Sequence, residues 1–152
     1  MELQPPPVTS TPYRSVMEQF EEMTDKKNLT YDQGGILNKQ SGYDLLWLSE
    51  QYLDIASVIN KKIIEGDKES AKVLLSESSK IVEQISDLNV SPKYEDAKEY
   101  LRSATWLDGF SYVMMLEGMP RKDYEETMND GGLRQMYLFV QEMNKLGHDI
   151  KF

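Results

Sequence analysis

The chain has 152 residues, of which 39% are hydrophobic and 28% are charged, a balance typical of one globular domain. Seventeen basic and 26 acidic residues give a formal net charge of −9, which argues against nucleic acid as a partner. Cysteine is absent, which excludes disulfides, zinc–thiolate sites and cysteine nucleophiles, and His148 is the single histidine. We therefore expect a protein that is not an enzyme and that holds no cofactor and no metal.

Proline dominates the beginning of the chain, where residues 4–12 read QPPPVTSTP. Proline lacks a backbone N–H and excludes helix when repeated, so residues 1–10 are expected to form a flexible tail or stalk. A single helical domain is expected over residues 11–152. No apolar run approaches the ~20 residues that a membrane-spanning helix needs. Membrane contact would therefore require an anchor that precedes the tail and is missing from this sequence.

A short amphipathic helix is predicted after the tail, from the capping pair Thr11-Pro12 to about Asp25. Its apolar stripe is a candidate partner-binding surface and comprises Tyr13, Val16, Met17, Phe20 and Met23. Residues 26–41 are then expected to form the one long loop, because the Gly34-Gly35 pair disfavours helix.

Two long helices with apolar residues at helical spacing are predicted next, over about residues 42–65 and 68–88. Between them Gly66 is suited to end the first helix and Asp67 to cap the second, so the two are antiparallel neighbours. A buried seam is predicted along these helices and the one that follows, formed by Leu45, Leu48, Tyr52, Ile55, Ile59, Leu74, Ile81, Ile85, Leu101 and Ala104.

Two further helical stretches complete the chain. One begins at a Ser-Pro pair, covers about residues 92–117 and ends at Gly118. The other opens at Pro120 and contains Asn129-Asp130-Gly131-Gly132, where we expect either a kink or two helices in line. Long helices joined by short turns predict an all-α, up-and-down four-helix bundle, with the short N-terminal helix as an addition.

Asp108 is a carboxylate at a position where the preceding spacing predicts a core residue. One interpretation places it in a cleft between helices that would take a cationic ligand, with Trp106, Phe110 and Tyr112 as the other lining residues. In the alternative, the helix rotates by part of a turn, so that Leu107 joins the core and Asp108 faces water. The alternative follows from the high free energy of an unpaired buried carboxylate.

The helix ends are similar to those of a known group of proteins. Gly66-Asp67 joins two helices, Glu117-Gly118 closes a third, and the segment that opens the third is Ser91-Pro92-Lys93-Tyr94-Glu95-Asp96-Ala97-Lys98-Glu99-Tyr100-Leu101. This arrangement, over residues 43–146, resembles extracytoplasmic four-helix-bundle proteins of archaea and bacteria, often lipid-anchored and of uncharacterised function. The resemblance implies a stalk that precedes a bundle, and it implies no activity and no site residues. The chain departs from that group in lacking a leader and a lipid-attachment cysteine.

The stalk, the acidic composition and the lack of catalytic groups together favour a non-enzymatic interaction or sensing module. We expect it to be extracytoplasmic and tethered by its N-terminal stalk. The alternative is an intracellular adaptor or regulatory protein, of the kind carried by phages or plasmids, that binds a protein partner through the N-terminal helix. Both interpretations predict a protein partner or self-association, no nucleic acid and no catalytic residue.

Overall fold

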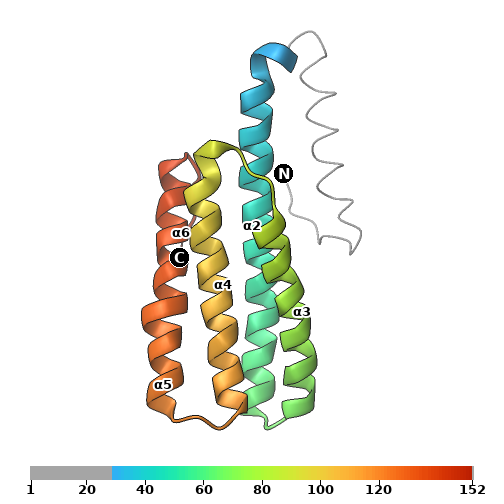
Figure 1. Cartoon of the computed structure of the whole chain (residues 1–152), viewed down its shortest axis with the longest axis vertical. Coiled ribbons are helices and arrows are strands. Elements are labelled where there is room, and N and C mark those ends of the chain that lie inside the picture. The colour runs from blue at the N-terminus through green and yellow to red at the C-terminus, as the bar shows by residue number, and fades with distance from the viewer. Residues whose placement is uncertain (1–28, 152) are drawn as a thin grey trace.

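A computed structural model describes residues 29–151, with side chains from residue 36 onward. In this part of the chain helices are joined by short connections, and there is no strand. The first three long helices are α2 (Leu29–Ile64), α3 (Lys68–Asp87) and α4 (Glu95–Leu116). The fourth is continuous from residue 121 to 145 and consists of α5 (Arg121–Glu126), the π-helical η3 (Thr127–Leu133) and α6 (Arg134–Lys145). The predicted all-α bundle of four long helices is confirmed (Figure 1).

The predicted tail, the N-terminal helix and its stripe lie outside the described residues. Within them, no helix combines the length and apolarity that crossing a membrane requires.

The turns that join α2 to α3, α3 to α4 and α4 to α5 form where the sequence predicts them. Gly66 and Gly118 have φ angles of 80° and 73°, the left-handed conformation that closes α2 and α4. The Asp67 carboxylate accepts a hydrogen bond of 3.1 Å from the backbone N–H of Ser70 and so caps α3. Between α3 and α4 the short 3-10 helix η2 (Pro92–Tyr94) begins at the predicted proline. These local signals set the alternating direction of the helices.

The loop predicted over residues 26–41 is wrong for residues 29–41, which belong to α2. α2 is 36 residues long, about 54 Å at 1.5 Å per residue, and its N-terminal end projects beyond the other helices (Figure 1). Two glycines disfavour helix by only about 2 kcal/mol in total. Hydrogen bonds with Ser91, the residue before η2, offset this penalty. Ser41 Oγ accepts a 2.9 Å bond from the Ser91 N–H, and Asn38 Oδ1 accepts a 2.6 Å bond from Ser91 Oγ.

The core runs along the facing sides of the helices. α2 packs along α3 and α4, and α6 packs along α4, whereas α2 and α6 have at most marginal contact. The largest fully buried apolar side chains are Leu45, Trp47, Leu48, Tyr52, Ile59, Ile85, Leu101, Phe139 and Met143. The predicted seam is buried except for Ile55 and Leu74, which are half-buried at its edge. The backbones of α2 and α6 therefore lie farther apart than those of the other packed pairs, and side chains of both helices fill the core between them.

The glycine-containing segment of the fourth helix does not interrupt it. The sequence predicted either a kink or two helices in line there, and the structure has a π-helical stretch instead. Residues 127–133 are π-helical and continuous with the α-helix on both sides. A π-helical turn contains an extra residue, so it changes the face that the following helix presents. Such turns occur frequently at functional sites.

Candidate functional site

The Asp108 side chain is half-buried on α4 and is bonded to a tyrosine from another helix. The hydroxyl of Tyr52, on α2, donates a hydrogen bond of 2.7 Å to Asp108 Oδ2. Tyr52 is only 1% exposed, so its ring is part of the core while its hydroxyl reaches the carboxylate. The pair links two helices across 56 positions of the sequence.

A cavity of about 310 Å³ opens beside this pair, and we call it the Asp108 cavity. Residues from α2, α4, η3 and α6 line it: Tyr52, Leu53, Ala56, Ser57, Ala104, Asp108, Tyr112, Met128, Asn129, Gly132, Leu133 and Met136. The cavity lies on the side of the bundle where α2 and α6 have at most marginal contact. Its size is at the lower end of the range for small-molecule sites, about 300–1,000 Å³.

Two glycines bring the π-helical segment against α4 at this point. A Cβ on Gly132 would lie 3.1 Å from the backbone N of Asp108, and one on Gly131 would lie 3.1 Å from Leu107 Cδ1. Gly132 is buried and lines the cavity. The absence of side chains here therefore allows η3 to approach the backbone that carries Asp108.

Burial and the contact between Asp108 and Tyr52 shift the pKa values of the ionisable groups at this site. Burial raises the pKa of the Asp108 carboxyl, while the hydrogen bond from Tyr52 acts in the opposite direction. Burial, with the nearby Asp108 charge, raises the pKa of Tyr52 well above its usual range, and Tyr112 shows the same effect. Both tyrosine hydroxyls consequently stay protonated at neutral pH.

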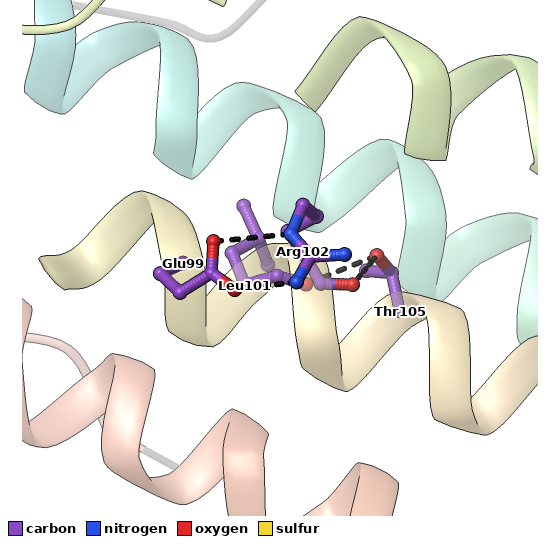
Figure 2. Close-up of polar contacts among 4 residues, drawn as sticks. All are labelled: Glu99, Leu101, Arg102 and Thr105. Atoms are coloured by element: carbon purple, nitrogen blue, oxygen red, sulfur yellow. Dashed lines mark hydrogen bonds and ion pairs between the residues drawn. The ribbon is translucent and has the colours of Figure 1, made fainter. Parts of the chain in front are cut away.

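Basic side chains do not line the Asp108 cavity among the described residues. On the preceding turns of α4, the Arg102 guanidinium is paired with Glu99, with a hydrogen bond of 3.0 Å from Nε and a second from its terminal nitrogen. Figure 2 shows this pair, and shows the Thr105 hydroxyl donating back to the carbonyls of Leu101 and Arg102. The polar groups on this stretch of α4 are thus satisfied locally, and Asp108 has no cationic partner within the described part of the chain.

A second hollow lies between α3 and α4 and has a different character. It has a volume of about 330 Å³, and its lining includes Leu75, Val82, Trp106, Gly109, Phe110 and Val113. The rings of Trp106 and Phe110 stack with centroids 5.5 Å apart and are 54% and 44% exposed. This is an apolar surface groove with Glu83 as its one charged lining residue among those described.

The four residues predicted to share a cleft are therefore divided between two sites. Asp108 and Tyr112 line the Asp108 cavity, whereas Trp106 and Phe110 line the groove between α3 and α4. Asp108 neither faces water freely nor lies deep in the core, and Leu107 is half-buried beside it. The sequence analysis missed the role of Tyr52, which it assigned to the seam. The position of Tyr52 within an apolar stripe could have indicated this role, because a buried tyrosine hydroxyl needs a hydrogen-bond acceptor nearby.

No cluster of three or more histidine or acidic residues suited to hold a metal is found in the part of the chain that the structure describes. No family model matches this chain, and comparison with curated proteins and with solved structures likewise gave no match. The fold and the site together define an all-α bundle with a small, partly polar cavity between its helices.

Proposed function

We propose that this protein is a non-enzymatic sensing module that binds a small molecule in the Asp108 cavity. The observation that carries the proposal is the Tyr52–Asp108 hydrogen bond, because both residues line one cavity between helices. Partial burial of a carboxylate is unfavourable for folding, and the hydrogen bond from Tyr52 compensates only one of the two Asp108 oxygens. An apolar pocket with a few convergent polar groups is the usual form of a ligand site.

The residue types in the cavity suit binding rather than catalysis. The raised pKa values of Tyr52 and Tyr112 keep both hydroxyls from acting as bases or nucleophiles at neutral pH. Ser57 lies at an exposed position without a histidine or lysine beside it in the cavity lining. Asp108 is the one acidic residue in the described lining and has no basic partner there, an arrangement that suits orienting a ligand.

A ligand in this position would contact three parts of the bundle at once. The lining combines α2 with η3 and α6, and the backbones of α2 and α6 are not among the closely approaching pairs. Binding to the folded state alone stabilises it by RT ln(1 + [L]/Kd), about 2.7 kcal/mol at a ligand concentration 100 times Kd. Occupancy would therefore tighten the bundle, which is a signal that a partner can detect.

The remaining parts of the proposal come from the sequence. The Pro-rich tail supports a module tethered on the extracytoplasmic side. The apolar stripe predicted between Tyr13 and Met23 supports a protein partner or a second copy as the receiver of the signal.

A fragment screen read by NMR tests the ligand site. The methyl groups of Met128 and Met136 line the cavity, so fragments that bind there should shift both signals. Ser57→Phe places a ring at the mouth and should abolish those shifts. Ser86→Phe makes the same change at an exposed position on α3 outside the cavity lining and should preserve them. A screen in which no fragment moves the two methyl signals, or in which Ser57→Phe changes nothing, would contradict the proposal.

A further inference from the structure

The hydroxyl groups of the Asp108 cavity have already donated their protons to protein acceptors. Tyr52 Oη donates to Asp108 Oδ2 at 2.7 Å, and Tyr112 Oη donates to the Ala56 carbonyl at 3.3 Å. Ser57 Oγ donates at 3.0 Å to a carbonyl of its own helix. A hydroxyl has one proton but two lone pairs, so these groups offer a ligand acceptors and no donors. A ligand rich in hydrogen-bond donors is the complement of this set.

The carboxylate adds a charge to these acceptors. Asp108 Oδ2 is bonded to Tyr52, and no described residue donates a hydrogen bond to Oδ1. The lining holds no basic side chain, and Arg102 on the same helix is paired with Glu99. Asn129 carries amide donors, but it is an exposed residue and belongs to the rim. A cationic donor would therefore compensate the carboxylate and satisfy the free oxygen at once.

The rest of the cavity is apolar and small. Its walls are formed by Leu53, Ala56, Ala104, Met128, Leu133 and Met136. A volume of about 310 Å³ corresponds to on the order of ten non-hydrogen atoms, at the ~30 Å³ that a water molecule occupies in the liquid. The ligand is consequently a compact molecule with one polar end and a hydrocarbon body.

We infer that the Asp108 cavity binds a small protonated primary amine, with its ammonium group on Asp108 and its hydrocarbon tail against the methionine and leucine walls. This inference rests on the proposed ligand-sensing function and names the chemical class of the ligand. An ammonium group offers three N–H donors, which match Asp108 Oδ1 and the lone pairs of Tyr52 and Tyr112. A neutral or anionic ligand would leave the carboxylate uncompensated.

Calorimetric titration of the full chain with matched probes tests the class. The probes are phenethylammonium, the neutral 2-phenylethanol of the same skeleton, phenethyltrimethylammonium, which keeps the charge but has no N–H, and phenylacetate. We expect phenethylammonium to bind at least about tenfold more tightly than 2-phenylethanol, because a charge-assisted hydrogen bond contributes more than a neutral one. The trimethyl compound should bind more weakly than the primary amine, and phenylacetate should not bind.

Variants assign the preference to the carboxylate. Asp108→Asn should reduce the affinity for phenethylammonium to that for the alcohol, while Asp130→Asn removes an equal charge from an exposed position of η3 and should preserve it. If Asp108→Asn does not fold, Asp108→Ser serves instead, because it removes the charge with a smaller side chain and should reduce the amine affinity in the same way. Equal affinity for amine and alcohol in the unmodified protein, or an unchanged amine affinity in the Asp108 variant, would overturn the inference.

The two proposals fail in different ways. If amine and alcohol shift the Met128 and Met136 methyl signals equally, the cavity binds ligands but does not select amines, and only the inference falls. If neither these probes nor any other fragment moves those signals, the sensing function falls as well.

Discussion

The contact between η3 and α4 gives a sharp test, because two adjacent glycines there meet different kinds of atoms. A Cβ on Gly132 would lie 3.1, 3.2 and 3.3 Å from Asp108 N, Cβ and Cα, in the middle of α4. A Cβ on Gly131 would meet the tip of the Leu107 side chain at 3.1 Å. The backbone of a helix cannot move at one residue alone, whereas a leucine side chain can rotate.

Alanine substitutions should therefore separate the two positions. Each gains up to about 1 kcal/mol of helix propensity over glycine. Gly132→Ala also incurs the overpacking penalty, typically about 1–3 kcal/mol, so its net effect is a loss of stability. Gly131→Ala should be neutral or stabilising. The propensity gain cancels in the comparison, which leaves a difference of about 1–3 kcal/mol between the two variants.

Urea denaturation measures this difference. With an m value of about 2 kcal/mol/M, a difference of 2 kcal/mol separates the midpoints by about 1 M. Equal m values would show that the compactness of the folded and unfolded states is unchanged. If Gly132→Ala is as stable as Gly131→Ala, the close approach of η3 to the Asp108 backbone does not exist, and the geometry of the cavity would need revision.

Three further variants test other parts of the fold. Burial raises the pKa of Asp44 to about 7, although a hydrogen bond from Gln40 acts in the opposite direction, so the free energy of unfolding should fall as pH rises from about 4 to 7. Asp44→Asn should remove this pH dependence and be more stable than the unmodified protein at pH 8, as measured by urea denaturation at several pH values. Burial lowers the pKa of His148, whose ring is hydrogen-bonded to the Tyr94 hydroxyl at 2.7 Å. Gly42→Ala would place a methyl group 2.7 Å from that ring and displace it toward solvent, so an NMR titration should show the His148 pKa rising toward 6.5; an unchanged pKa would contradict this close contact. Asp67→Ala removes the cap of α3 and should lower the free energy of unfolding by about 1 kcal/mol, whereas Ser86→Ala on the same helix should leave it nearly unchanged.

The sequence alone predicted the features that depend on neighbouring residues. Gly66 and Gly118 end helices because glycine adopts positive φ without steric penalty, and Asp67 caps α3 because a short carboxylate reaches the N–H three residues on. The apolar spacing between Leu45 and Ile59 predicted the buried face of α2, because an α-helix has 3.6 residues per turn. Such signals determine where helices end and which face is buried.

Only the tertiary structure decided the features that depend on distant residues. Residues 29–41 are helical although Gly34 and Gly35 argue against it, and Ser91, some 50 positions away, bonds to Asn38 and Ser41. Tyr52 contacts Asp108 because α2 and α4 pack with these two positions at the same level along the bundle, and no local sequence pattern determines that alignment. Trp106 and Phe110 line the groove on the other side of α4 from Asp108, because each is two residues away from it and two residues correspond to about 200° around the helix axis. Helical periodicity predicted which side chains could be buried, and the packing of whole helices selected which of them form the cavity.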